Sequence, residues 1–319
     1  MMRKLLPLLL FCLLLTACSR DPLAPMASDA GTSLPAPVAE ALPAEENRAV
    51  LWFRFGAEPY LAPEARIIAT VSTDNYALAL LRALAEGPGA ASTELRSLFP
   101  QGTQVLACAQ SGRVMFVTLS KHILNSYADE PASWRDDPYW AAEVPLRRQL
   151  CMQSIAATLT ENCPVDTVVI LVDQSTTDSL RLRKGYYTLD GDPSLAEPLT
   201  RDEALLLTPA RTAEVVLQCW QESDWARLYR YVARTDPDTG TERPTEADFA
   251  AMMAEGKRLL HATAQGGSVH GSSAIFTVSG AYLDAGAEKA FTGMVLRLTQ
   301  EKGVWRVGLS QLTGREVLP

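Results

Sequence analysis

The sequence predicts an α+β fold in two domains, and three observations lead to this prediction. Residues 49–173 alternate strand-like and helix-like runs in the order strand, helix, strand, strand, helix, strand. Residues 209–312 instead place helix-like runs first and three strand-like runs last. The first 47 residues show neither pattern. We therefore expect one domain at 48–199 and a second at 200–319.

The first residues predict a lipoprotein signal peptide over 1–17. Two basic residues precede an apolar run of about a dozen residues, too short for a bilayer that needs about 20. The small residues Thr16 and Ala17 then stand directly before Cys18. Leu15 to Cys18 resembles the bacterial lipobox, which implies that Cys18 becomes the first mature residue and carries a lipid. A plain secretory signal with an accidental cysteine is the alternative.

Residues 18–47 read as a tether between the lipid and the folded part. They carry five prolines among alanine, serine, aspartate and glutamate, and no hydrophobic period that could build a core. Such a chain can hold the folded part at some distance from the membrane. We therefore expect an extracytoplasmic protein, anchored by lipid to the cell membrane.

The charge balance narrows the choice of partner. The chain has 29 basic and 37 acidic residues, a net charge of −8. Removal of the leader takes away two basic residues, so the mature chain carries 27 basic against 37 acidic residues, a net charge of −10. An acidic surface argues against nucleic acid and against direct adhesion to anionic lipid.

Four cysteines remain after the leader and the lipidated residue: Cys108, Cys151, Cys163 and Cys219. Four cysteines outside the cytoplasm allow three disulfide pairings, and the sequence does not choose among them. The strand-like and helix-like settings of three of them favour buried thiols, because free cysteine packs as a small hydrophobe. None has metal-ligand spacing with the three histidines, so we expect no metal and no cofactor.

The elements of the first domain follow from hydrophobic period and turn residues. Thr73 and Asp74 can cap the first helix, and Gly87 with Pro88 can end it. The expected strands and helices are a strand at 49–55, the helix ending at 86, a hairpin of strands at 103–109 and 113–119, a helix at 144–162 and a strand at 165–173. This order predicts a split βαβ arrangement, in which two helices cover one face of a small sheet and leave the other face free.

These elements carry motifs that resemble the GerMN domain of sporulation and germination lipoproteins. The shared pattern is a leucine-rich helix ending in Gly-Pro, then a Leu-x-Pro-x-Gly-Thr entry to the hairpin, then a helix and a valine-rich strand. In this sequence the matching positions are Leu81, Leu84, Gly87, Pro88, Leu98, Pro100, Gly102 and Thr103. The resemblance covers about residues 52–198. The strand at 113–119 lacks the acidic residue usual in the family, and one copy of the domain is present where some members have two.

The GerMN resemblance implies assembly rather than catalysis, because these domains resemble the ring-building modules of secretion and sporulation channels. It brings no catalytic residues to this sequence. We accordingly expect no catalytic residue, and we predict a non-catalytic protein for the first domain, while the sequence leaves activity in the second domain open.

The second domain begins at Pro209 and places its helices ahead of its strands. Val216, Trp220, Leu228 and Tyr231 have helical spacing, with a break expected at Ser223 and Asp224. A further helix is expected over 245–261, and strands over 268–283, 289–300 and 304–312. Helices followed by an antiparallel sheet resemble the cone-shaped NTF2-like fold, whose relatives include enzymes, pairing domains and binding domains.

The stretch 125–145 is the most suggestive candidate for a contact site. It carries four aromatic residues, among them Trp134, Tyr139 and Trp140, beside several carboxylates. Aromatic side chains next to carboxylates anchor protein interfaces and also stack on sugar rings. An ordered loop that packs over its own core is the structural alternative.

The sequence therefore predicts a lipid-anchored protein of the bacterial cell envelope that works in sporulation or germination through protein–protein contacts. Its expected partners are the membrane, reached through the lipid, and envelope or sporulation assembly proteins. Two alternatives use other surfaces: peptidoglycan bound by the aromatic stretch, or a small ligand or substrate in an NTF2-like cavity. That cavity would hold polar groups such as His270, Tyr282 or Arg297.

Overall fold

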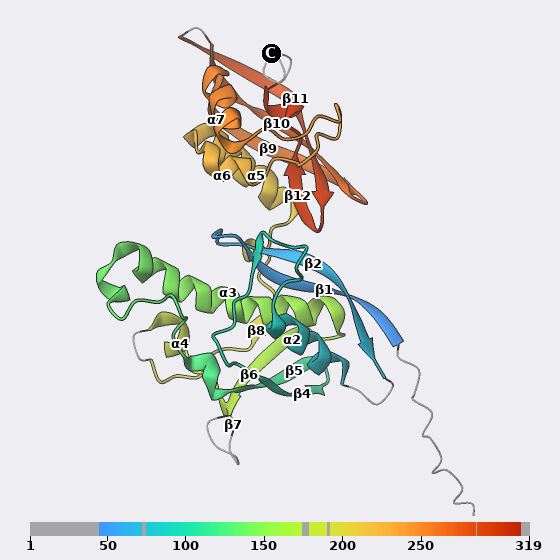
Figure 1. The fold of residues 1–319 in the computed structure, drawn as a ribbon, viewed down its shortest axis with the longest axis vertical. Helices are drawn as coiled ribbons and strands as arrows, with labels where there is room; N and C mark the ends of the chain where they lie inside the picture. Colours follow the sequence, from blue (N-terminus) through green and yellow to red (C-terminus); the bar gives the residue numbers. More distant parts are fainter. Residues whose placement is uncertain (1–44, 72–74, 174–178, 190–191, 285, 314–319) are drawn as a thin grey trace, which may run out of the picture. The chain divides into compact units, whose positions relative to one another are not determined.

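Two antiparallel sheets and a mixed sheet, with helices packed between or against them, make up the described part of the chain (Figure 1). This computed structural model describes residues 45–71, 75–173, 179–189, 192–284 and 286–313. The fold is α+β, as predicted. Among these residues, no helix is both long enough and apolar enough to cross a membrane. Cys18 lies outside the described residues.

The first sheet is built on β1 (Glu45–Phe55), which pairs along its full length with β2 (Leu61–Thr70). A two-residue strand, β3 (Leu95–Arg96), pairs with the end of β1. β1 begins at Glu45, within the segment expected to be tether. The strand β2 was not predicted, because Pro63 and the charged residues Glu64 and Arg66 conceal its apolar positions.

The second sheet contains β4 (Val105–Ser111), β5 (Val114–Ser120), β6 (Thr167–Asp173) and β7 (Ser179–Arg181), with β8 (Leu199–Thr200) also paired to β6. The β4–β5 hairpin turns at Gly112, which has a φ of +59° and confirms the predicted turn. β5 and β6 run parallel, and α3 lies between them in the chain.

Two helices lie between these sheets, α2 (Tyr76–Glu86) and α3 (Pro138–Asn162) (Figure 1). Both helices contact β1, and they also contact β4 and β6, respectively. The expected single sheet is therefore wrong in one respect: the strand at 49–55 joins β2 in a separate sheet on the far side of the helices. The predicted elements do follow one another in the expected order, with β2 and β3 as additional strands.

The ends of α2 and α3 agree only in part with those predicted from capping residues. Gly87 ends α2 with a φ of +99°, as predicted, whereas the expected cap at Thr73 and Asp74 lies outside the described residues. Asn75 caps the helix instead, and its side chain accepts a hydrogen bond from the Leu78 amide (3.1 Å). α3 starts six residues earlier than expected, because Asp137 caps it and Pro138 occupies its first turn.

Polar side chains of α3 bind the edge of β1 that faces away from β2. Asn162 accepts from the Val50 amide (2.9 Å) and donates to the Val50 carbonyl (2.8 Å). Thr158 accepts from the Trp52 amide (3.1 Å), and Ser154 donates to the Trp52 carbonyl (2.6 Å). These side chains replace a neighbouring strand, so the backbone groups of this buried stretch are satisfied.

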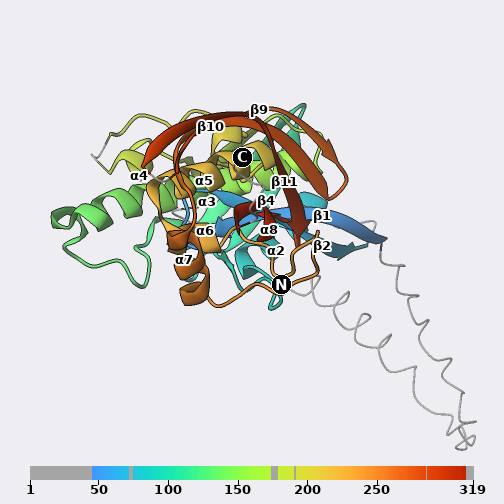
Figure 2. The ribbon, with the colours of Figure 1, turned by 90° about the horizontal axis from the view of Figure 1, so that it is seen from above.

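The remaining elements form the second half of the chain: helices α5 (Pro209–Glu222), α6 (Trp225–Tyr229) and α7 (Glu246–Glu255), then a four-stranded antiparallel sheet. Its strands are β9 (Arg258–His270), β10 (Ser273–Asp284), β11 (Ala287–Glu301) and β12 (Val304–Val307). Figure 2 shows β9 and β10 curving past α5, which packs on β9. Short elements complete the chain: 3₁₀ turns at Lys121–Leu124, Trp134–Asp136 and Glu203–Leu205, and helices α4 (Gly185–Thr188) and α8 (Ser310–Thr313).

Three predictions for the second half need correction. The helix expected over 245–261 ends at Glu255, because Gly256 stops it, and Arg258 to His261 belong to β9. The run expected as one strand over 268–283 contains the β9–β10 turn, where Gly271 has a φ of +57°. The last expected strand ends at Val307 rather than 312. The break at Ser223 and Asp224 is confirmed, and the NTF2-like likeness stays a prediction.

The four cysteines are free thiols, and Cys108, Cys151 and Cys219 are buried. Cys151 lies with Ile155 and Leu159 on the predicted apolar face of α3, and all three are fully buried. Burial raises the pKa of the Cys108 and Cys219 thiols to about 12, so these groups stay protonated near neutral pH.

Candidate functional site

A cleft of about 870 Å³ lies beside the end of β1 and the start of α3. One wall comes from residues 93–101, which include β3. The opposite wall comes from the stretch 125–145, through Tyr127, Asp129, Tyr139 and Glu143. The stretch singled out in the sequence therefore borders the cleft.

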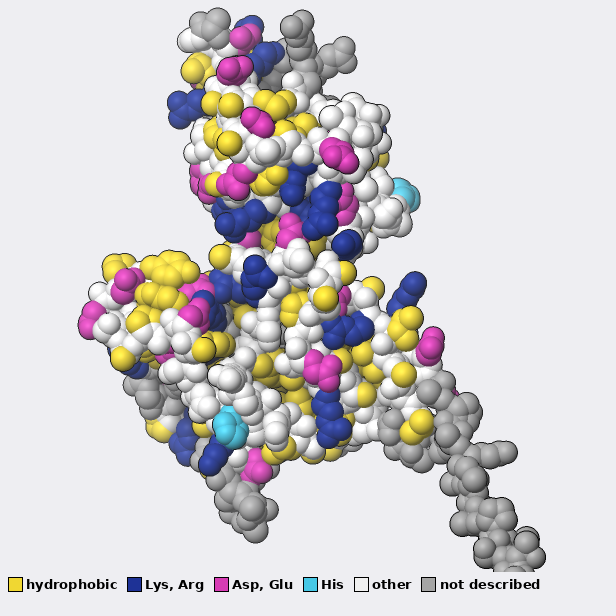
Figure 3. Space-filling view, viewed as in Figure 1, with side chains coloured by type: hydrophobic (Ala, Val, Ile, Leu, Met, Phe, Trp, Pro, Cys, Tyr) yellow, Lys and Arg dark blue, Asp and Glu magenta, His cyan; other side chains and the backbone are white. Residues whose placement is uncertain are grey.

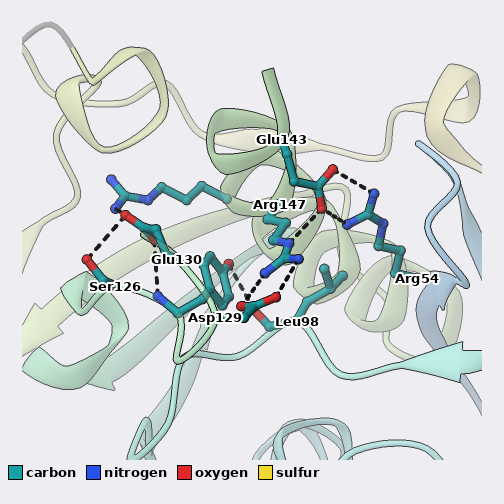
Figure 4. A network of polar contacts seen from close by, with 9 residues as sticks. Arg54, Leu98, Ser126, Asp129, Glu130, Glu143 and Arg147 are labelled. Carbon is teal, nitrogen blue, oxygen red and sulfur yellow. Dashed lines mark hydrogen bonds and ion pairs between the residues drawn. The ribbon is translucent and has the colours of Figure 1, made fainter. Parts of the chain in front are cut away.

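Four charged side chains, each joined to the next by an ion pair, lie along this wall (Figure 4). Arg54 of β1 forms a bidentate ion pair with Glu143 of α3, and the second bond measures 3.0 Å. Glu143 also accepts from Arg147 Nε (2.6 Å), one helical turn further along α3. Arg147 in turn donates to both carboxylate oxygens of Asp129 (2.6 and 2.9 Å). We call Arg54, Glu143, Arg147 and Asp129 the ion-pair quartet.

The quartet is buried at one end and exposed at the other. The side chains of Arg54 and Glu143 are only 5% and 7% exposed, whereas that of Asp129 is 60% exposed. Arg54 also donates to the backbone carbonyls of Ala57 (2.7 Å) and Glu58 (2.8 Å). The buried guanidinium of Arg54 therefore has both a carboxylate and backbone carbonyls as partners, as a buried charge requires.

The quartet lowers the pKa values of its two carboxylates. Burial alone would raise the pKa of Glu143, but hydrogen bonds from Arg54 and Arg147 lower it below its usual value. A hydrogen bond from Arg147 likewise lowers the pKa of Asp129. Burial raises the pKa of the neighbouring Tyr127. These groups keep one protonation state near pH 7.

Aromatic rings pack around Arg147. Its guanidinium lies 5.4 Å from the centre of the Tyr127 ring and 5.3 Å from that of Trp140. The Tyr127 hydroxyl donates to the Leu98 carbonyl (3.1 Å) on the opposite wall, and its amide donates to Glu130 (3.1 Å). The stretch is thus held to both α3 and the β3 segment.

The three predicted contact residues have different positions. Trp134 is buried beneath the guanidinium of Arg135, at 4.2 Å, so it packs over the core. Tyr139 and Trp140 lie in the first turn of α3 and meet edge to face, with ring centres 5.3 Å apart. Tyr139 is 59% exposed and lines the cleft. Figure 3 shows hydrophobic side chains gathered over this end of α3.

A second surface lies on the face of the β4–β6 sheet that is turned away from α2 and α3. Val117 and Ile170 point to the helices and are buried, so their neighbours Phe116 and Leu171 point to the opposite face. Phe116 and Leu171 are partly exposed there, and Ala109, paired with Phe116, is exposed. This outer sheet face is the surface that the split βαβ prediction left free.

The polar groups suggested for a cavity in the second half do not converge. His270 is exposed at the β9–β10 turn, about nine residues along the sheet from Tyr282, or about 30 Å. Tyr282 is buried, and Arg297 pairs with Asp238 (2.7 Å). In the described ranges no cluster of His, Cys, Asp and Glu could hold a metal ion.

The sequence could not reveal the ion-pair quartet, because Arg54 and Glu143 stand 89 residues apart and have no shared motif. A weak signal existed: Glu143 and Arg147 have the i, i+4 spacing of a helix pair, but the helix was expected to begin only at residue 144. Arg54, a charged residue between Phe53 and Phe55 at the end of an apolar strand, was the other hint.

Residues 54–178, which run from the end of β1 through β6, match the Germane family model, described as sporulation and spore germination. The predicted resemblance to the GerMN domain is confirmed over these residues. No curated protein matches the chain.

The solved structures that are similar to this chain include two of GerMN domains. One contains the tandem GerMN domains of the sporulation protein GerM from Bacillus subtilis, with 17% identity over 49% of this chain and 47% of that chain, and a TM-score of 0.32. The other is the first GerMN domain of the same protein, with 17% identity over 49% of this chain and 98% of that chain, and a TM-score of 0.33. The chain spans about half the length of the tandem structure.

Proposed function

We propose that this chain is a lipid-anchored, extracytoplasmic and non-catalytic protein that acts through protein contacts in envelope assembly during sporulation or germination. The observation that carries the proposal is the outer sheet face of the GerMN domain, defined by Ala109, Phe116 and Leu171. Partly exposed apolar and aromatic side chains on a flat sheet are typical of the core of a protein interface.

The ion-pair quartet supports a non-catalytic role for the first domain. General acid–base catalysis near pH 7 needs a group whose pKa lies close to that value. In the cleft, Glu143 and Asp129 have lowered pKa values and Tyr127 has a raised one. Each is thus fixed in a single protonation state, which suits a structural or binding surface.

The anchoring part of the proposal rests on the sequence. The lipobox-like Leu15 to Cys18 and the proline-rich stretch that follows would place the folded part outside the cytoplasm on a tether. An acidic chain gains little from direct adhesion to anionic lipid, so attachment would come from the acyl chains on Cys18.

Crosslinking with mass spectrometry in cells that express the tagged chain tests the proposal. We expect envelope or sporulation assembly proteins to be captured by the wild type and lost with Ala109→Lys, because a lysine would stand in the outer sheet face. Thr263→Lys, at an exposed position of β9, is the matched control and should capture as the wild type does.

Cys18→Ala tests the anchor in the same experiment. We expect this variant to leave the membrane fraction and to lose the captured partners. Capture that is unchanged in Ala109→Lys would refute the outer sheet face as the contact surface. Membrane attachment that is unchanged in Cys18→Ala would refute lipidation at this residue.

A further inference from the structure

We propose that the cleft beside the ion-pair quartet binds a saccharide chain through its hydroxyl groups and ring faces. This inference goes beyond the proposed protein contacts and uses a different surface. It rests on three features of the cleft: its largely paired charges, its exposed aromatic residue and its size.

Most charged side chains that line the cleft already have partners, which favours an uncharged ligand. Arg54 and Arg147 are neutralised by Glu143 and Asp129, Glu94 pairs with Arg306, and Arg230 lies 3.6 Å from the carboxylate of Glu58. Arg96 donates to the backbone carbonyls of Thr93 (2.7 Å) and Leu95 (3.2 Å). A charged ligand would have to compete with these pairs for its partner. A hydroxyl-rich ligand need not, because it can donate to and accept from groups that are already paired.

Hydrogen-bonding capacity remains at the exposed end of the quartet. Each oxygen of Asp129 has lone pairs beyond the one used by Arg147, and the carboxylate is 60% exposed. Gln101 and Ser97 are exposed on the opposite wall. The cleft therefore offers fixed acceptors on one side and amide and hydroxyl groups on the other, which matches the alternating donors and acceptors of a sugar.

Tyr139 provides a surface on which a sugar ring can stack. Tyr139 is 59% exposed and lines the cleft, and its ring rests edge to face on Trp140. Trp140 is in turn packed against the guanidinium of Arg147 at 5.3 Å. The ring is thus supported from behind by the quartet, so binding would cost little side-chain ordering.

The volume of about 870 Å³ lies within the range of about 300–1,000 Å³ that is usual for ligand sites. The cleft is lined by both walls described above and is open to solvent along the exposed carboxylate of Asp129. A chain of linked sugar rings could therefore enter without displacing the buried pair of Arg54 and Glu143.

Calorimetric titration with N-acetylchitotetraose tests this inference on the full-length protein in detergent. We expect saturable binding, weakened at least tenfold by Tyr139→Ala and also by Asp129→Ala. Ile67→Ala, at a similarly exposed apolar position on β2 (62%), is the matched control and should bind as the wild type does. Circular dichroism confirms that each variant is folded.

A second titration uses muramidase fragments of purified sacculi. These fragments carry peptide stems with carboxylates in addition to the sugar chain, so they test whether charge contributes to binding. Binding of both probes with the same loss in Tyr139→Ala supports recognition of the sugar. Binding of the fragments alone, lost in Arg96→Ala, would overturn the assignment of an uncharged ligand. Absence of saturable binding to either probe, or binding unaffected by Tyr139→Ala, would overturn the site.

Each of the two proposals can be refuted without refuting the other. Partner capture in cells depends on the outer sheet face, and we expect it to survive Tyr139→Ala. Saccharide binding depends on the cleft, and we expect it to survive Ala109→Lys.

Discussion

Glu143 links two arginines, and it is the carboxylate that pairs with the buried guanidinium of Arg54. It binds Arg54 from β1 and Arg147 from its own helix, and its side chain is nearly inaccessible to water. A buried charge that loses its partner is far more costly than an exposed one. A substitution of Glu143 should therefore have a large effect on the free energy of unfolding.

We expect Glu143→Gln to lower the free energy of unfolding by about 3 kcal/mol, because it leaves the buried guanidinium of Arg54 without its counter-charge. Urea denaturation followed by circular dichroism measures the change. Asp166→Asn, which breaks the exposed ion pair with Arg113, is the control and should change stability little. Equal losses in the two variants would contradict the importance of burial here.

Acid should weaken the same contacts. The folded protein lowers the pKa of Glu143 and Asp129, so it favours their charged forms. Their stabilising effect is therefore complete above the unfolded pKa values of about 4 and is lost as the pH falls through the lower, folded values. Urea midpoints at pH 6, 4 and 3 should fall more steeply for the wild type than for the Glu143→Gln, Asp129→Asn double variant. Parallel slopes would show that the quartet does not contribute to acid sensitivity.

The candidate site was only partly predictable from individual residues. Tyr139 and Trp140 were visible as aromatic residues beside carboxylates, and Tyr139 does line the cleft. Trp134 had the same appearance in the sequence but is buried. Aromatic residues have both apolar and polar parts, so their type alone does not say whether they pack inside or face a ligand.

Among the elements, β1 and β2 were harder to predict than the helices. Ala49–Phe55 was expected as a strand, but its partner β2 has a proline and two charged residues in the middle of its apolar run. Those residues lie on an edge strand, where proline and charge are tolerated. Local pattern therefore identified the central strand and missed the edge, and the separate sheet could not be inferred.

The turn between β11 and β12 has a special requirement for glycine. Lys302 and Gly303 both have positive φ, and that of Gly303 reaches +88°. A Cβ atom at Gly303 would overlap the carbonyl oxygen of Pro63 on β2. Gly112, in the β4–β5 turn, also has positive φ, at +59°, but a Cβ atom there would meet nothing.

We expect Gly112→Ala to cost about 1 kcal/mol of unfolding free energy, from backbone strain alone. Gly303→Ala should cost clearly more, because the new methyl group also pushes against β2. Thermal and urea unfolding of both variants measures the difference. If the two variants lost equal stability, the approach of this turn to β2 would be looser than described.

At the scale of the molecule, carboxylates of the first half meet arginines of the second. Glu58, which follows β1 and is 4% exposed, accepts two hydrogen bonds from Arg227 of α6 (2.9 and 2.7 Å). Glu94, next to β3, pairs with Arg306 of β12. The described residues from Glu45 onward accordingly belong to one compact unit.

We expect the wild type to unfold in a single transition and the Glu58→Gln, Glu94→Gln double variant in two. Loss of both carboxylates removes charges that couple the halves and leaves the almost fully buried Arg306 with one carboxylate partner, Glu301 (3.2 Å), instead of two. Tryptophan fluorescence and circular dichroism, followed together in urea, test whether the transitions coincide. Asp284→Asn, which breaks a surface pair within the β10–β11 hairpin, is the control.

The order of elements along the chain was predicted, but not the arrangement of its layers. Sequence periodicity reports which face of an element is buried, not which other element covers it. The position of β1 above α3 depends on hydrogen bonds between residues more than 100 positions apart, such as Val50 with Asn162. Contacts of that kind leave no local trace in a single sequence.

The hydrogen bonds between α3 and β1 also bear on how the chain would respond to mechanical force. β1 is the first strand of the described fold, so a pull on the preceding segment reaches it before any other element. Glu45 pairs with Thr70 at the open end of the β1–β2 hairpin, where strand pairs under tension would separate one after another. The amide of Asn162 and the hydroxyls of Thr158 and Ser154 hold the opposite edge of the strand, and would stop this unzipping near Val50. With the lipid anchor proposed above, load on the preceding segment would be borne by this strand while the cleft beyond Arg54 keeps its shape.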